Sequence, residues 1–346
     1  MISSLNVRGY RGFAKYAMHN LTRINLLVGK NNSGKTSLLE ALHLLWAGAD
    51  IGALWQTLAR RGEQPVPEQV PGRGIQQEVD VSHVFTGHRM TVGESEFSIG
   101  ATNETPSRSI KYQITAPAPS ENVALYNQLV TQDPTGATMG LKISIGKQAL
   151  PSIPLSRRGG LRADIFSQAA NTFRSISKTE SNVEFIATES LTAPELAQLW
   201  NDLALRPEEE LVLRALRFID PEIERIAPLV TPHWFGSGRG GFIVRRAKEE
   251  RVPIGSFGDG IWRIFSLAIA LSIVKNGVLL IDEIDTGLHY SVLTQMWKFI
   301  DEVSKDFNVQ VFATTHSYDC IHSLATLCRD IENAQSGLYP VRLTPA

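Results

Sequence analysis

Apolar and polar residues follow different periods at the ends and in the middle of this chain. The run Ile24–Val28 is continuously apolar and ends at a glycine, which predicts a buried strand. Apolar residues then recur at helical spacing over Ser33–Trp46, which predicts a helix with one apolar stripe. The same reasoning predicts strands over Ile2–Val7, Gly277–Asp282, Val309–Thr314 and Leu338–Leu343, and helices from Thr192 to about Leu205, over 207–219, Gly258–Val274 and His289–Lys305.

The middle of the chain has another pattern. From Val79 to about Ser156, segments such as SIKYQIT and GLKISIG alternate apolar and polar residues and are separated by turn residues. This pattern is typical of antiparallel strands. Residues 62–74 predict a loop and Gly236–Gly241 a glycine-rich turn, whereas residues 157–182 are polar and mixed and indicate no particular element. No heptad pattern persists, so a long coiled-coil arm is not expected. Strands followed by helices at both ends favour an α/β fold whose parallel sheet carries insertions.

The composition narrows the class of protein. Of the 346 residues, 43% are hydrophobic and 20% charged, which is enough apolar side chain to exclude disorder as the main state. The net charge of -1 gives no overall basic field. Cys320 and Cys328 are too few for a disulfide framework or a four-ligand zinc site. The most apolar stretch is shorter than the ~20 residues that span a bilayer. The N-terminus has no apolar signal segment, so we expect a cytoplasmic protein without membrane contact.

Residues Gly29–Thr36, between a predicted strand and a predicted helix, match the G-x-x-x-x-G-K-[ST] phosphate loop. Its glycines let backbone N–H groups and the helix N-terminus face phosphates. We expect Lys35 to point to solvent without nucleotide and to reach the β and γ phosphates of ATP, and Thr36 to offer its hydroxyl to Mg²⁺. The expected ATP-binding residues here are Gly29, Asn31, Asn32, Ser33, Gly34, Lys35, Thr36 and Ser37.

Three further motifs carry candidate chemistry. Asp282 ends an apolar strand and can hold Mg²⁺ through water, which leaves Glu283 as a candidate base for the attacking water. His316 follows another predicted strand, where its imidazole could contact a γ-phosphate. The glycine-flanked segment Ser256–Gly260 precedes an apolar helix and therefore predicts an anion site at that helix N-terminus, with Arg263 shortly after it.

Taken together, the segments GKNNSGKT, SFGDG, LLIDE, IDTGLH and TTHS resemble, in order and spacing, an ABC-type ATPase of the SMC/RecF class. More closely, they are similar to AAA ATPases related to the overcoming-lysogenization-defect (OLD) family, many of which accompany nucleases in phage defence. The resemblance covers residues 1–48 and 252–320. It implies an α/β P-loop NTPase with a single ABC-type domain over 1–346. Its core would be 1–50 and 250–346, with an antiparallel β-rich insertion at about 79–156 and a small helical insertion at about 190–230.

The resemblance also implies a head-to-tail homodimer that sandwiches two ATP molecules with Mg²⁺. The phosphate loop of one copy would face Ser256, Gly258, Asp259 and Gly260 of the other, with Asp285 at the dimer seam. The opening Gly9–Phe13 resembles the N-terminal segment of the class, which makes Arg11 a phosphate or adenine contact. SFGDG departs from a serine followed by paired glycines. The glutamine with which the class senses Mg²⁺ is either Gln76 or Gln77.

The expected activity is slow ATP hydrolysis that regulates a separate effector, a nuclease or toxin in phage defence. Only 30 residues follow His316, too few for the nuclease domain of OLD proteins, so nucleolysis is expected in a partner chain. One alternative is a RecF-like DNA-binding ATPase in repair. Another is an ATP-binding scaffold or sensor with little turnover, against which Glu283 argues, and a transporter subunit is disfavoured by the signature. Three basic clusters could contact DNA: Arg60-Arg61; Arg157-Arg158 with Arg162; and Arg245-Arg246 with Lys248 and Arg251. The second cluster is the best candidate.

Overall fold

In the computed structural model, the chain folds into two units. The parallel-sheet unit comprises Met1, Thr22–Leu39 and Asn182–Val341, and the antiparallel-sheet unit comprises Ile2–Leu21, Glu40–Ser181 and Arg342–Ala346. The structure describes residues 1–64, 77–102, 107–121, 123–124, 127, 138–156, 158–176, 182–229, 241–247, 249–330 and 336–340.

The parallel-sheet unit is built on a five-stranded sheet in the order β11-β15-β16-β3-β17. All neighbouring strands are parallel, so their carboxyl ends meet at one edge. That edge is where ligands bind in open α/β sheets. The strands are β11 (Val183–Ile186), β15 (Val278–Ile281), β16 (Gln310–Thr315), β3 (Ile24–Val28) and β17 (Ser336–Pro340).

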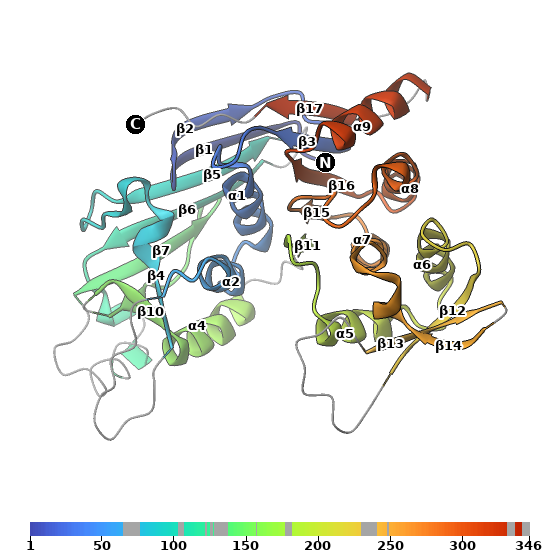
Figure 1. Ribbon diagram of the computed structural model, residues 1–346. Helices are drawn as coiled ribbons and strands as arrows, with labels where there is room; N and C mark the ends of the chain where they lie inside the picture. The colour runs from blue at the N-terminus through green and yellow to red at the C-terminus, as the bar shows by residue number, and fades with distance from the viewer. Residues whose placement is uncertain are drawn as a thin grey trace. The chain divides into compact units, whose positions relative to one another are not determined.

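Helices on one face of this sheet complete its core (Figure 1). Leu279 and Ile281 of β15 face these helices, because alternate residues of a strand point to the same side. The helices that share this core are α7 (Asp259–Ile273), α8 (Tyr290–Asp306) and α9 (Tyr318–Asp330). Helix α7 is apolar on all sides and buried almost throughout, so it forms the centre of the unit.

The inserted helical region of this unit adds two short helices and a small antiparallel sheet. Thr192 accepts from the Glu195 N–H while the Glu195 side chain accepts from the Thr192 N–H, a capping box that starts the first helix. Trp200, Phe242, Trp262 and Phe265 bring the insertion and α7 into one aromatic cluster. The elements are α5 (Ala193–Leu203), α6 (Glu208–Leu216), β12 (Ile223–Pro228), β13 (Phe242–Arg246), β14 (Glu249–Pro253) and the 3₁₀ helix η4 (Ile254–Phe257).

The antiparallel-sheet unit has a seven-stranded sheet in the order β2-β1-β5-β6-β7-β8, with β9 also paired to β7. Phe97 stacks on its cross-strand neighbour Tyr112 with ring centroids 4.5 Å apart, and this pair sits in the apolar layer of the sheet. The strands are β1 (Ser4–Tyr10), β2 (Phe13–Met18), β5 (Glu96–Thr102), β6 (Arg108–Thr115), β7 (Met139–Ile145), β8 (Gln148–Ala149) and β9 (Ile153–Leu155). Outside this sheet lie α2 (Gly52–Arg60), β4 (Glu78–Asp80) paired with β10 (Gly160–Arg162), α4 (Ala163–Ile176), and the 3₁₀ helices η1 (Val81–Val84), η2 (Thr86–His88) and η3 (Pro119–Glu121).

Most predicted elements are confirmed, with shifts at their ends. The strand Ile24–Val28 has the predicted bounds, whereas the helix predicted over Ser33–Trp46 begins later, as α1 (Lys35–Ala47). Residues 157–182, for which no element was predicted, contain β10 and α4, whose buried residues Ile165, Ala169 and Phe173 recur at helical spacing. The strand predicted over Leu338–Leu343 is present as β17 at the sheet edge, and residues 341–346 lie outside the described ones. The 62–74 loop and the Gly236–Gly241 turn lie mostly outside them as well.

The longest helix in the described ranges is α8, with 17 residues, so no long coiled-coil arm occurs there. Across the same ranges, no helix combines the length and apolar character that crossing a bilayer requires.

Candidate functional site

The phosphate loop follows β3 at the carboxyl edge of the parallel sheet and leads directly into α1. Asn32 and Gly34 have positive φ values of 59° and 90°, which lets the backbone turn tightly before the helix. Lys35 does not point to solvent as predicted: its side chain folds back, and its Nζ donates to the carbonyls of Gly29 at 2.9 Å and Lys30 at 3.1 Å. Lys35 is only 5% exposed, so the loop itself holds the ammonium group.

A cavity of ≈ 660 Å³ opens beside this loop, lined by Gly29, Lys30, Asn31, Thr315, His316 and Ile321. The Ser33 hydroxyl is buried and has no hydrogen-bond partner among the described residues. Ser37, one residue beyond Thr36, is buried within the helix. Gly29 and Asn31 of the predicted loop therefore border a space that can take a ligand, and the unpaired buried hydroxyl of Ser33 fits a phosphate oxygen.

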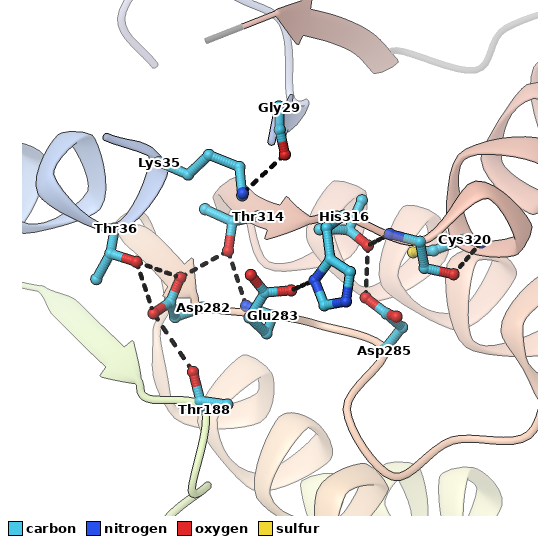
Figure 2. A network of polar contacts seen from close by, with 12 residues as sticks. Gly29, Lys35, Thr36, Thr188, Asp282, Glu283, Asp285, Thr314, His316 and Cys320 are labelled. Atoms are coloured by element: carbon cyan, nitrogen blue, oxygen red, sulfur yellow. Dashed lines mark hydrogen bonds and ion pairs between the residues drawn. The ribbon is translucent and has the colours of Figure 1, made fainter. Parts of the chain in front are cut away.

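Three threonine hydroxyls converge on the Asp282 carboxylate (Figure 2). Thr36 Oγ1 lies 3.1 and 3.0 Å from the two carboxylate oxygens, Thr314 Oγ1 lies 2.6 Å from Oδ1, and Thr188 Oγ1 lies 3.4 Å from Oδ2. The two predicted metal residues, Thr36 and Asp282, are thus adjacent although 246 positions apart. Hard oxygen donors of this kind fit Mg²⁺.

Glu283 and His316 form a second pair beside this cluster (Figure 2). Glu283 Oε2 and His316 Nδ1 lie 2.7 Å apart, and the His316 side chain is 60% exposed. Glu283 has a φ of 48°, a left-handed conformation that costs a non-glycine residue about 1–3 kcal/mol and occurs mostly at functional sites. Its N–H donates to Thr314 Oγ1 at 2.8 Å, which helps to hold this conformation. The structure therefore brings the predicted base and the predicted histidine together.

Arg263, noted from the sequence only as a residue after SFGDG, contacts the same edge. Its guanidinium donates to backbone carbonyls of the turns that follow β11 and β15. Burial lowers the pKa of Arg263 to about 10, against the opposing effect of the nearby carboxylates of Asp282, Asp285, Glu189 and Glu283. The group therefore stays charged at neutral pH.

Ser256, Gly258 and Asp259 of the SFGDG segment are exposed, and the segment does not contribute to the cavity lining given above. Gly258 has a φ of 79° and precedes the first residue of α7, where no side chain caps the helix. A Cβ on Gly260 would lie 2.9 Å from the Gly287 carbonyl oxygen, so this glycine permits the close approach of the turn after Asp285. Asp285 itself accepts from Thr315 Oγ1 at 2.6 Å.

Arg11 lies in the antiparallel-sheet unit, at the turn between β1 and β2. Its guanidinium pairs with both oxygens of Glu63, at 2.6 and 3.0 Å, and with Glu40 at 2.9 Å. Burial alone would lower the pKa of Arg11, but Tyr10 and the two carboxylates raise it. Its observed role is to compensate buried carboxylates, and its contact with nucleotide stays a prediction.

The structure does not decide between Gln76 and Gln77 as the predicted Mg²⁺-sensing glutamine. Gln76 lies outside the described residues, and Gln77 precedes β4 in the antiparallel-sheet unit, where its carbonyl accepts from the Ala163 N–H. Strand β11 pairs with β15, and the residues that follow β11 include Thr188 and Glu189. Sequence reasoning missed Thr188, because the short segment VEFI was not predicted as a strand.

Four arginines of the basic clusters, Arg61, Arg162, Arg245 and Arg246, pair with neighbouring carboxylates. Arg162 is 4% exposed and pairs with Asp164 at 2.7 Å, so its predicted place on a DNA-binding surface is wrong. The remaining pairs in the described residues are Arg61 with Glu40, Arg245 with Glu224, and Arg246 with Asp220 and Glu222. Arg157 and Lys248 lie outside the described residues.

A phosphate loop, an Asp-Glu strand end and a histidine meet at one edge of the parallel sheet, and the fold is that of the ABC-type ATPases of the SMC/RecF class. The family described as "AAA domain, putative AbiEii toxin, Type IV TA system" matches residues 24–319, and the chain belongs to this family. The α/β fold predicted from the motifs is therefore confirmed.

Individual relatives are distant. A Helicobacter pylori protein named "ATP/GTP phosphatase" is 22% identical, over 95% of this chain and 89% of the relative. The DNA replication and repair protein RecF of Idiomarina loihiensis is 47% identical, but only over 14% of this chain and 13% of the relative. Among solved structures, the Smc head domain bound to the C-terminal domain of ScpA from Pyrococcus furiosus has a TM-score of 0.52 at 13% identity and covers 99% of this chain and 94% of the other. A second Smc head, bound to the C-winged helix domain of ScpA, has a TM-score of 0.51 at 15% identity and covers 93% and 91%.

Proposed function

We propose that this protein binds ATP with Mg²⁺ at the phosphate loop, hydrolyses it slowly, and forms a head-to-tail dimer while ATP is bound. The single observation that carries the proposal is the convergence of Thr36, Asp282 and Glu283 at one edge of the sheet. The Helicobacter pylori relative, named an ATP/GTP phosphatase, supports nucleotide hydrolysis.

Each side chain has a role in this proposal that follows from its position. Lys35 exchanges its two loop carbonyls for phosphate oxygens, which are stronger partners for an ammonium group. Thr36 and Asp282 would hold Mg²⁺, which neutralises charge on the β and γ phosphates. Glu283 accepts the proton of the attacking water, and His316, at 2.7 Å from it, orients that carboxylate.

The dimer is proposed because the SFGDG segment presents exposed residues at the start of a helix. Ser256, Gly258 and Asp259 are exposed at the N-terminus of α7, where backbone N–H groups favour an anion. They do not line the cavity beside the phosphate loop. A second copy could bring its own SFGDG segment to the γ-phosphate, with Asp285 at the seam.

The biological role that we propose is control of a separate effector, a nuclease or toxin, by an OLD-like ATPase in the cytoplasm. The description of the family, which includes an AbiEii toxin, supports this link. Smc heads solved with ScpA domains provide a precedent for a related fold that carries a protein partner.

A RecF-like ATPase acting on DNA is the second candidate. It is favoured by the short segments shared with RecF proteins. The ion pairs of Arg61, Arg162, Arg245 and Arg246 weigh against it, because paired arginines offer less charge to a phosphate backbone. If this candidate is right, DNA stimulates the ATPase, and the stimulation falls steeply with salt.

Nucleotide titration of Lys35→Ala tests the proposed site. We expect wild-type protein to bind a fluorescent ATP analogue with Mg²⁺, and the variant to lose this binding while its far-UV circular dichroism is unchanged. Lys298→Ala is the matched control, because Lys298 is an exposed lysine on α8 that does not line the cavity beside the loop. Equal affinity of Lys35→Ala and wild type would overturn the site.

A further inference from the structure

Arg263 has an unusual set of partners for a buried cation. It lies on the first turns of α7, is 1% exposed, and directs its guanidinium at two turns of the sheet edge. Nη1 donates to Ala187 O at 2.7 Å and Ser190 Oγ at 3.0 Å, after β11. Nη2 donates to Asp282 O at 2.5 Å and Glu283 O at 2.8 Å, after β15, and Nε approaches Ile284 O at 3.5 Å.

These partners set Arg263 apart from the other buried arginines. Arg11 and Arg162 pair with carboxylates, whereas Arg263 makes no ion pair in the described part of the chain and bonds mainly to main-chain carbonyls. Burying an unpaired cation costs several kcal/mol, and an apolar side chain would fill the same space more cheaply. What the guanidinium contributes is geometry, because its planar fork fixes two separate turns at once.

The turns that Arg263 holds carry the side chains of the site. One of them presents Thr188 to Asp282, and the other contains Asp282 and Glu283 themselves. Glu283 is in the left-handed region, and a strained residue persists only where its surroundings over-determine it. Thr314 fixes its N–H and Arg263 its carbonyl, so the peptide groups on both sides of Glu283 are held.

We propose that Arg263 is a positioning residue that sets the orientation of Glu283 and joins it to the helix that begins with SFGDG. Because Asp259 and Arg263 are one helical turn apart on α7, a displacement of the helix N-terminus moves the guanidinium and the two turns with it. A ligand that meets SFGDG can thereby change the alignment of the base. This inference rests on the proposed ATPase function.

Amide hydrogen exchange in the absence of nucleotide tests the structural half of the proposal. In Arg263→Met, exchange of the Glu283 and Ile284 amides should accelerate at least about tenfold, because their turn loses its anchor. Trp262→Phe is the matched control: it removes another buried hydrogen bond from α7, to Leu191 O at 2.9 Å, without touching the Asp282–Glu283 turn. Equal exchange in Arg263→Met and wild type would overturn the proposal.

Kinetics test the functional half through a double-mutant cycle. We expect Arg263→Met to lower kcat roughly 10²-fold, the cost typical of a misplacement of ~1 Å, with ATP affinity nearly unchanged. In a Glu283→Gln background the same change should slow the residual rate less than about twofold, because Arg263 acts through Glu283. Equal effects in both backgrounds would mean a general structural role and would overturn the proposal.

Two further outcomes keep the test decisive. If wild-type protein does not hydrolyse ATP, the proposed function fails, while the hydrogen-exchange result still decides whether Arg263 holds the turn. If Arg263→Met does not fold, Ser190→Ala removes one guanidinium partner and leaves Arg263 in place. We then expect a smaller loss of kcat that again disappears with Glu283→Gln, and full activity of Ser190→Ala would contradict the inference.

Discussion

Thr314→Val removes a single hydroxyl from the centre of the site while preserving the shape of the side chain. Thr314 is completely buried, donates to Asp282 at 2.6 Å and accepts from the Glu283 N–H at 2.8 Å. The lost bond to a charged group is worth about 1.5–3 kcal/mol, and the unpaired N–H costs about 1–3 kcal/mol. Thr36 and Thr188 still donate to the carboxylate, which offsets part of the loss. We therefore expect a fall of about 2–4 kcal/mol in the free energy of unfolding.

This change in unfolding free energy is measured by unfolding the protein in urea and monitoring hydrogen exchange of β15 and β16, which lie in the unit that contains the site. Thr326→Val is the control, because the one hydrogen bond of the Thr326 side chain within the described residues goes to the exposed His322 carbonyl, and its loss should stay within about 0.5 kcal/mol. Thr314→Val should also lower ATP turnover by at least about tenfold, since Glu283 loses the hydroxyl that accepts from its N–H. A loss of stability no larger than that of Thr326→Val would refute the reasoning.

Three other experiments test separate parts of the structure. Mixing Lys35→Ala with Ser256→Arg, each inactive alone, should restore up to roughly a quarter of the wild-type ATPase activity, because random pairing leaves one intact shared site in about half of the dimers. Absence of both rescue and ATP-dependent cross-linking would contradict the head-to-tail dimer. Burial, aided by the charge of Arg60, lowers the pKa of His43 to about 4, so the unfolded state binds the proton more readily and stability falls as the pH drops from about 6.5 towards 4. Between about pH 6.5 and 5, His43→Gln should make the fall in the free energy of unfolding smaller by about 1.5 kcal/mol. If the free energy of unfolding in urea depends on pH in the same way in the variant and the wild type, His43 is not the group responsible. Arg11→Met should cost about 3–5 kcal/mol, because it leaves Glu40 buried with one less cation, and a change below about 1 kcal/mol would be inconsistent with the observed pairs.

The parts of the fold that sequence could predict are those whose signal is local. The strand Ile24–Val28 and the loop after it combine an apolar run, glycines and a lysine within a few residues. Asp282 and Glu283 were predicted in the same way, from the strand that they end. A local pattern of this kind predicts both the secondary-structure element and the functional residues on it.

The contacts that sequence could not predict depend on pairings between distant segments. Thr188 meets Asp282 only because β11 lies beside β15 in parallel register, and the four residues of β11 are too few for a periodic signal. The partners of Arg263 are mostly backbone carbonyls, which have no sequence signature. Arg162 looked like a surface charge in a polar segment, but β10 and α4 bury it against Asp164.

Phosphate release from ATP by wild type and Glu283→Gln tests the central claim most directly. With Mg²⁺, wild-type protein should release phosphate over many turnovers, and Glu283→Gln should bind ATP with similar affinity but turn over about 10²–10⁴-fold more slowly. The variant should also accumulate as an ATP-bound dimer on size exclusion. Near wild-type turnover by Glu283→Gln would contradict the assignment of the base. The absence of phosphate release by the wild type would contradict the ATPase itself.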